Sequence, residues 1–434
     1  WESYSDCNMD FINTRLYLLF KYILAYEDPE IIYPYLKHYI KVLNQCIQLN
    51  GRLGAGFKTD YSAFHHDKHY PGYFSPAISN LNRALKFFKT ISFSEELKIK
   101  SNKLETFAQI IKGIRINHAT SYLPLNGSSR DPFKFQLTKW LFLDYASAVE
   151  NIEDLAGKRT EMLKICMRMF SDGCKRNETK DIPPEDSPSG FWQFNYRPHS
   201  VYREEGWVAN ITGFNKYLWG SEIYPTQNRF GRYLSYGSVL IDYEGKDDIS
   251  SKQEQGWDWN IIPGTTTIHL DSSRLVAEKD RQDEQTDSNF SAGLRFKLKD
   301  KSYLDPKLEG QRGIYGFKFQ QKSLSNTHND SFTFQKSVFA QDGYLLLLGS
   351  GISARNTKGN VATNLFQQHK DLGDQIIING NNILIDSSST ILNANEPHWL
   401  IDRLGAGYII PQENDSLVVT IEEQTNRDSK DTKD

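Results

Sequence analysis

The sequence predicts an α+β protein of several domains, in which an array of helical hairpins is followed by an antiparallel β-sandwich. Three observations predict this order. Apolar residues recur at helical spacing through the first 180 residues, a polar segment with three prolines follows at 177–190, and short alternating segments separated by Gly, Asn and Asp come after it. A chain of 434 residues is long enough for two or three domains with a large buried core.

The first part of the chain contains six segments with helical periodicity. One of them opens with Ser94 and an early pair of glutamates, which is typical of a capped helix start. Helices of this length in pairs, joined by short loops, favour a hairpin array over a mixed sheet. The predicted helices span 11–26, 28–49, 80–91, 94–114, 135–152 and 158–170.

The proline-containing segment marks the predicted domain boundary. We therefore expect a helical domain over 1–180, a linker over 181–190 and a β-domain over 191–434. Alternating apolar and polar residues between turn formers predict strands in the β-domain. These strands span 233–243, 265–270, 313–321, 343–352, 374–380 and 416–423, and the polar end of the chain at 422–434 is expected to be disordered.

Composition narrows the function classes. The net charge of −3 argues against a general nucleic-acid binder, which usually carries a basic excess. No apolar run approaches the roughly 18 residues that a membrane-spanning helix needs. The aromatic content of 13% fits either sugar-stacking rings or a thick β-core. The start has no initiator Met and no signal-peptide pattern, so we expect a processed chain or a fragment.

The cysteines and histidines raise the question of a metal site. Four cysteines without a CxxC spacing are expected to be free thiols, and they complete no zinc pattern. The stretch FHHDKHYPGY (64–73) places His65, His66 and His69 at spacings that could converge on one helix face. Pro71 would end such a helix, which argues against a metal. A loop with exposed histidines and a packed tyrosine, or a proton-transfer site, are the other interpretations.

A resemblance to a known family favours proton transfer. The segment 56–73 resembles the catalytic loop of polysaccharide lyase family 8, specifically the chondroitin sulfate ABC lyases. Further similar blocks follow in the family's order at 123–133, 219–233, 255–270, 336–352 and 398–410. The resemblance implies an α/α toroid followed by antiparallel β-sandwich domains. Because the familiar enzymes are longer at both ends, we expect an incomplete toroid and a β-sandwich truncated at the C-terminus.

The resemblance also implies four catalytic residues for a β-elimination. His66 would neutralise the uronate carboxylate, and Tyr73 would act as base and then as acid. Arg130 would lower the tyrosine pKa, and Glu222 would orient the arginine or the substrate through charge-assisted hydrogen bonds. For iduronate, whose proton lies on the opposite face, His66 is a candidate second base.

The chemistry of the reaction explains these residue types. The proton on C5 lies beside a carboxylate, so its removal builds a second negative charge next to an existing one. A donor to the carboxylate offsets this charge as it develops. A tyrosine has an ordinary pKa of about 10, so a nearby guanidinium is needed to favour the phenolate near neutral pH. The resulting phenol can then pass its proton to the leaving C4 oxygen.

Further residues are expected to contact the polymer. Asn13 is similar to an asparagine of the corresponding toroid helix, and His65 stands where a relative has arginine. This difference at position 65 bears on the preference for the iduronate-containing polymer. The charged and amide residues of the QNRFGRY motif could line the cleft or be ordinary strand-edge charges: Asn228, Arg229 and Arg232. Three tryptophans could stack on sugars or belong to the β-core: Trp219, Trp257 and Trp259.

The sequence therefore predicts a lyase that cleaves chondroitin or dermatan sulfate, and hyaluronan as a further substrate. The alternatives are a non-catalytic glycosaminoglycan-binding protein or inactive fragment, and a structural protein with a histidine metal site. No cofactor is required; the acidic loop at 244–250 would be either a calcium site or a solvated charge run. We expect a monomer that binds a glycosaminoglycan and no nucleic acid, and the resemblance implies a periplasmic or secreted location.

Overall fold

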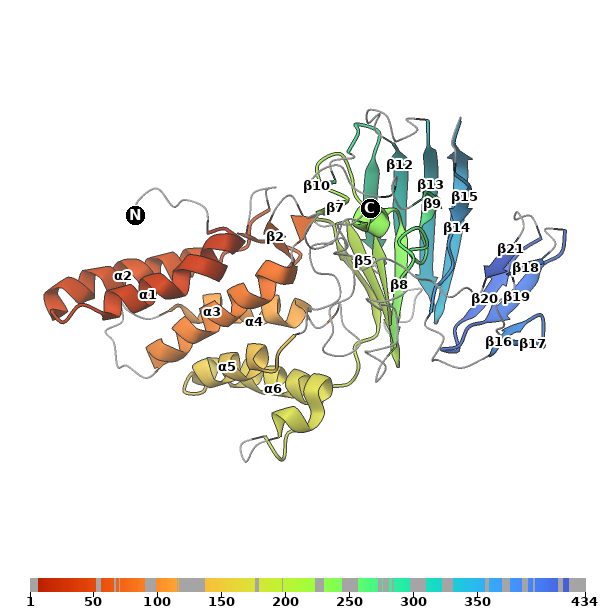
Figure 1. The fold of residues 1–434 in the computed structure, drawn as a ribbon. Helices are drawn as coiled ribbons and strands as arrows, with labels where there is room; N and C mark the ends of the chain where they lie inside the picture. Colours follow the sequence, from red (N-terminus) through yellow and green to blue (C-terminus); the bar gives the residue numbers. More distant parts are fainter. Residues whose placement is uncertain are drawn as a thin grey trace, which may run out of the picture.

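The computed structural model describes most of the chain. The described residues are 7–51, 56–65, 68–69, 71–89, 99–114, 116, 137–175, 179–196, 198–222, 230–243, 257–271, 275, 281–282, 285–296, 310–321, 331–355, 359–368, 375–384, 389–392, 395–412 and 417–420. Helices occupy the first part of these residues and antiparallel sheets the second, so the predicted α+β class is confirmed (Figure 1).

The helical part contains six α-helices that pack around one apolar core. They are α1 (Leu16–Leu24), α2 (Pro29–Cys46), α3 (Pro71–Lys89), α4 (Ser101–Ile114), α5 (Trp140–Ala148) and α6 (Ala156–Phe170). Asp28 caps α2 by accepting a hydrogen bond from the backbone N–H of Glu30, and Pro29 occupies the first helical position. Helix α5 packs against both α3 and α6. Of the helices in the described residues, none is long and apolar enough to cross a membrane.

The predicted helices are confirmed in place, with two corrections and one untested detail. Helix α3 begins at Pro71, nine residues before the predicted start at 80. The proline that we expected to end a helix begins one, because its fixed φ and missing N–H suit a first turn. The segment before α1 is a five-residue π-helix, η1 (Phe11–Arg15). The predicted cap Ser94 lies outside the described residues.

Two four-stranded antiparallel sheets form the centre of the β part. The first has the order β4 (Gly190–Phe194), β5 (His199–Glu204), β6 (Trp207–Thr212) and β8 (Ser238–Tyr243). The second has the order β11 (Phe290–Arg295), β12 (Gly313–Gln320), β13 (Thr333–Gln341) and β14 (Tyr344–Ser353). Side chains of both sheets share one apolar core, which includes Tyr202 and Ile211 of the first sheet and Tyr315 and Phe317 of the second.

Three two-stranded sheets and a further four-stranded sheet complete the described β part. They join β7 (Ser221–Glu222) to β10 (Arg281–Gln282), β9 (Thr266–Ile268) to β15 (Val361–Thr363), β18 (Ser389–Leu392) to β21 (Leu417–Thr420), and β17 (Asn381–Leu384), β16 (Gln375–Ile378), β19 (His398–Ile401) and β20 (Gly407–Ile410) in that order. Each of the six predicted strand segments contains a strand. The segment 233–243 is wrong at its start, where residues Gly231–Ser235 form the short 3₁₀ helix η6.

Two cysteines differ from the expectation of free thiols. Cys166 of α6 and Cys174 form a disulfide, with their Cα atoms 6.0 Å apart. The chain reverses after α6 through Ser171 and the 3₁₀ helix η5 (Ser171–Cys174), which brings the second cysteine back to the helix. Cys7 and Cys46 are free, as predicted. Sequence spacing cannot show such a reversal, since it depends on a single residue with a positive φ of 43°.

A buried arginine joins the helical part to the first sheet. Arg203 of β5 is only 1% exposed, and its guanidinium donates to the carbonyl of Ile116 at 3.2 Å and to that of Pro188 at 2.9 Å. Ile116 follows α4 and packs with Phe194 and Val201 of the sheet. The arginine therefore ties together the end of a helix, the linker and a strand.

A second buried cation lies inside the β part. Lys336 of β13 is 3% exposed and donates from Nζ to the carbonyls of Gly237, at 3.2 Å, and Gly264. Both glycines have a positive φ, as is typical of tight turns. The lysine therefore hydrogen-bonds to two tight turns that lie beside β8. Burial lowers the pKa of Lys336 to about 7.

Replacing Arg203 by methionine should lower the free energy of unfolding by about 3 kcal/mol, because the two buried carbonyls lose a charged donor. Urea denaturation measures this loss. Arg312→Met is the control, because Arg312 pairs with Asp342 at 2.8 Å on the surface, and such a pair contributes at most about 1 kcal/mol. Equal losses in the two variants would contradict the role assigned to Arg203.

The buried Lys336 should make stability depend on pH in a defined direction. Its folded pKa of about 7 lies below the ordinary value of 10.5, so between these values the unfolded chain binds more protons than the folded one. Stability should therefore rise as the pH rises from 7 toward 10, and this component should be absent in Lys336→Met. Urea midpoints of both proteins at pH 7 and pH 9 test this, and parallel changes in the two would refute it.

Candidate functional site

The histidine-rich stretch forms a small antiparallel sheet. Its strands are β1 (Gly56–Phe57), β2 (Ala63–His65) and β3 (Lys68–His69), and the register pairs Phe64 with His69 and His65 with Lys68. His65 and His69 therefore lie on adjacent strands, and the helical spacing on which the metal interpretation depended does not occur. Within the described part of the chain, no three His, Cys, Asp or Glu side chains gather as a metal site.

The structure brings Tyr73 and His65 together. Tyr73 lies in the first turn of α3, half-buried against the helical core. Its ring centroid is 4.6 Å from that of His65, with the ring planes tilted by 46°. The hairpin and the helix that follows it thus place an imidazole and a phenol side by side. The candidate carboxylate partner His66 adjoins His65 but lies outside the described residues.

A polar turn holds this hairpin in place. The carboxylate of Asp60 accepts hydrogen bonds from the backbone N–H and hydroxyl of Ser62, at 3.0 and 2.6 Å, and from the backbone N–H of Tyr196, at 3.2 Å. Tyr196 belongs to the β4–β5 turn, and its hydroxyl donates to the carbonyl of Gly51 at 2.9 Å. The turn of the hairpin and Gly51, which precedes the hairpin in sequence, are therefore both bonded to the β4–β5 turn.

Lys58 is a buried, positively charged residue of the same hairpin. Its side chain is buried, with Nζ 4.8 Å from the ring centroid of Phe64 and 5.7 Å from that of Tyr196. Burial lowers the pKa of Lys58 to about 8, and the neighbouring Asp60 carboxylate opposes part of that change. This cation lies on the hairpin that carries the candidate histidines.

Asn13 lies on the π-helix η1, which packs against α3. Its carbonyl accepts a hydrogen bond from the Nδ2 of Asn80, which also reaches the carbonyl of Ile12 at 3.4 Å. A π-helix frees carbonyls from the usual ladder, and such turns often mark functional sites. Asn80 follows Tyr73 by seven residues, which is about two helical turns along the same face of α3. Helix α3 therefore carries both Tyr73 and the bond that positions Asn13.

The β part contributes Glu222 and Arg232 from adjacent elements. Glu222 lies on β7, where its backbone pairs with Arg281 of β10. Arg232 lies on η6, which packs against β7, and its side chain is only 1% exposed. Such burial limits direct contact with a polymer, so its substrate-binding role stays a prediction. Arg130, Asn228 and Arg229 lie outside the described residues.

The burial of the tryptophans can be compared with their two interpretations, sugar stacking or the β-core. Trp257 and Trp259 are buried in the core shared by the two large sheets, so the core interpretation is confirmed for both. Trp219 is half-buried. Sequence reasoning did not identify Lys58, Asn80 or Tyr196 as parts of the site. Each of these residues acts through a contact with a residue distant in sequence. No local sequence pattern therefore identifies it.

Comparisons with known proteins agree with this organisation. The family description "Polysaccharide lyase family 8, super-sandwich domain" matches residues 189–430, more than half of the chain, and "Lyase, catalytic" matches residues 2–137. The chain is 29% identical to a chondroitin sulfate ABC exolyase of Proteus vulgaris over 93% of its own length and 40% of the relative's. It is 30% identical to the chondroitin sulfate ABC endolyase of that organism, over 82% and 33% of the two chains.

Solved structures show the same fold. A chondroitinase AC lyase studied in oligosaccharide complexes superposes with a TM-score of 0.69 at 17% identity, covering 93% of this chain and 57% of the other. A Paenibacillus xanthan lyase gives a TM-score of 0.63 at 16% identity, covering 85% and 35%. This chain thus spans well under half the length of the two Proteus enzymes. On the match over residues 189–430, the chain belongs to polysaccharide lyase family 8.

Proposed function

We propose that this protein is a lyase that cleaves uronic-acid-containing glycosaminoglycans, chondroitin and dermatan sulfate and also hyaluronan, by β-elimination. The observation that carries the proposal is the packing of Tyr73 against His65 at the start of α3, beside the junction of helices and sheets. Family membership supports the reaction class. The curated relatives are named for chondroitin sulfate, which supports the substrate class.

In this mechanism Tyr73 removes the C5 proton and then protonates the leaving C4 oxygen. His66, next to the hairpin residue His65, donates to the uronate carboxylate as its charge develops, and Asn13 assists from η1. Arg130 favours the phenolate form of the base. Glu222, from β7, orients the arginine or the substrate. Asn228, Arg229 and Arg232 contribute to binding of the anionic polymer.

The described contacts support convergence of these residues from both parts of the chain. Asp60 and Tyr196 bond the histidine hairpin to the first sheet, from which the chain continues to β7 and Glu222. Ile116, held by Arg203, immediately precedes the segment that contains Arg130. Helix α3 carries Tyr73 and, through Asn80, fixes the turn of Asn13. Tyr73 and Asn13 thus belong to elements that these contacts position.

The proposal extends to the finer architecture. The helical part, residues 1–180, would be a portion of an α/α toroid, and residues 191–434 an antiparallel β-sandwich joined to it by a linker at 181–190. The paired packing of the helices supports the first assignment, and the apolar core between the two large sheets supports the second.

The proposed location is outside the cytoplasm, in the periplasm or medium, and the protein would act as a monomer. The disulfide between Cys166 and Cys174 supports this location, because such bonds persist in oxidising compartments. A polymer too large to enter a cell requires an enzyme on the outside.

The proposal is tested by mixing the protein with chondroitin sulfate and following the ultraviolet absorbance of the unsaturated uronate. A rise in absorbance indicates elimination. Binding without any rise would instead support a non-catalytic glycosaminoglycan-binding protein. Dermatan sulfate and hyaluronan are assayed in parallel. Their rates test which uronate epimer is preferred, a preference on which the residue at position 65 bears.

Tyr73→Phe should abolish most of the elimination while the polymer still binds, since the variant lacks only the phenolic oxygen that takes the proton. Loss of a general base lowers kcat by about 10²–10⁴-fold. Absorbance kinetics and titration calorimetry separate turnover from binding. Tyr344→Phe, an exposed tyrosine on β14, is the matched control and should keep full activity. Full activity in Tyr73→Phe would exclude the mechanism.

Asn80→Ala should lower kcat more than it changes KM, because the variant frees the carbonyls of Ile12 and Asn13 and lets η1 shift. The lost hydrogen bond should also cost about 1 kcal/mol of stability. Asn44→Ala is the control, since Asn44 donates to the carbonyl of Ile40 within α2 alone. If both variants lose the same stability and neither changes kcat, Asn80 has only a structural role.

A further inference from the structure

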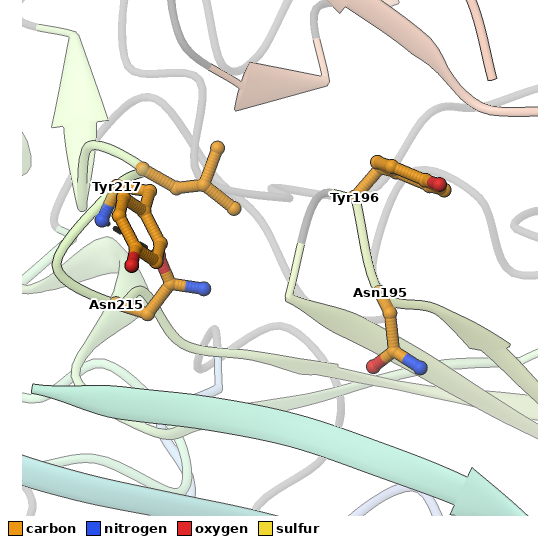
Figure 2. A pocket seen from close by; sticks show the side chains of 5 residues that line it. Asn195, Tyr196, Asn215 and Tyr217 are labelled. Carbon is orange, nitrogen blue, oxygen red and sulfur yellow. Dashed lines mark hydrogen bonds between the residues drawn. The ribbon is translucent and has the colours of Figure 1, made fainter. Parts of the chain in front are cut away.

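A pocket of about 210 Å³ lies at one end of the first sheet, between two turns. The β4–β5 turn contributes Asn195 and Tyr196, and the turn after β6 contributes Asn215, Tyr217 and Leu218 (Figure 2). The two turns share this end because β4 and β6 both run antiparallel to β5. The pocket is smaller than the roughly 300 Å³ at which drug-sized sites begin, so it suits a single ring.

The asparagine side chains of the pocket are held in fixed orientations. Asn195 accepts from the backbone N–H of Gly293 at 3.2 Å and donates to its carbonyl at 3.4 Å. Asn215 accepts from the backbone N–H of Tyr217 at 2.9 Å through Oδ1. This bond turns the Nδ2 of Asn215 toward the side of the pocket formed by Asn195 and Tyr196, as Figure 2 shows. The pocket therefore offers an oriented amide donor.

Two tyrosine rings supply the apolar surfaces of the pocket. Tyr217 is 58% exposed, so a face of its ring is open to a ligand. The ammonium of Lys216 lies 5.0 Å from the ring centroid of Tyr217, and that of Lys58 lies 5.7 Å from the ring centroid of Tyr196. Rings with polar edges match a sugar, which has C–H faces and hydroxyl edges. The exposed Lys216 beside this ring favours a sugar chain that carries negative charge.

The pocket adjoins the candidate catalytic segment on two sides. The backbone N–H of Tyr196 bonds to Asp60 in the turn that leads to His65. On the other side, Leu218 precedes Glu222 of β7 by four residues. A polymer that passes the candidate catalytic residues therefore has a short path to this pocket.

We propose that this pocket is a subsite for one non-reacting sugar ring of an anionic glycan. Tyr217 stacks on the C–H face of the ring, the Nδ2 of Asn215 donates to a ring substituent, and Lys216 attracts the acidic group. The inference rests on the proposed function for the identity of the polymer. It adds to that function a site that binds the polymer at a distance from the bond that is cut.

Two variants test the subsite by different routes. Tyr217→Ala removes the stacking ring from an exposed position. Asn215→Asp keeps an oxygen that accepts from Tyr217, so the turn keeps its hydrogen bond, while the amide donor is lost and the new negative charge repels the acidic polymer. Each variant should raise the Kd for chondroitin sulfate about tenfold, as expected for a contact near the middle of a binding site. Tyr344→Ala, the same change at an exposed tyrosine on β14, should leave the Kd unchanged.

Titration calorimetry reports the Kd without turnover when both variants and the control are made in the Tyr73→Phe background, and absorbance kinetics of the variants with Tyr73 intact report KM and kcat. The subsite predicts a raised KM with an unchanged kcat. A Kd and KM equal to those of the wild type in both variants would overturn the subsite, and elimination by the wild type would then still stand. A wild type that binds without eliminating would contradict the lyase function, while raised Kd values would still support the subsite. A wild type with no affinity for the polymer overturns the subsite.

Discussion

The bonds from Arg203 to the helical part are the constraint on which the arrangement of this protein depends. A guanidinium that is 1% exposed cannot lie in an apolar interior unless its donors are satisfied, and here backbone carbonyls of Ile116 and Pro188 accept them. Carbonyls are fixed to the main chain, so the bonds restrain whole segments. The end of α4, the linker and β5 are held in one geometry as a result, and the apolar contacts of Ile116 with Phe194 fill the space around it.

The histidine hairpin is attached to the sheet by the same kind of bond. Asp60 bonds to the main chain of Tyr196, and the hydroxyl of Tyr196 bonds to the main chain of Gly51. A junction made of directional polar bonds permits few alternative positions, whereas an apolar contact tolerates sliding. Chemistry that depends on positions within about 1 Å needs the first kind of junction. The helical elements with Tyr73 and the β part with Glu222 are joined in this way.

The sequence predicted the order of helices and strands because periodicity survives wherever one face is buried. Strands β12 and β13 alternate between buried and exposed residues, and segment 313–321 was predicted as a strand. Strands β5 and β6 were missed, because both of their faces are covered and their buried residues include His199, Ser200 and Arg203. The resemblance supplied the candidate catalytic residues. It could not supply Asn80 or Tyr196, whose roles exist only through contacts across 67 and 136 residues.

Tyr196 connects the junction to the proposed sugar subsite. Its ring borders the pocket, its main chain bonds to Asp60, and the Lys58 ammonium lies near its ring on the hairpin side. A sugar ring held against Tyr196 and Tyr217 would therefore limit motion of the turn that leads to His65. Binding energy from a ring that does not react would then hold the polymer equally in the ground and transition states, which is why KM and not kcat is expected to change. Tyr196 borders the pocket and bonds to Asp60 of the hairpin turn, so one residue links the proposed subsite to the hairpin.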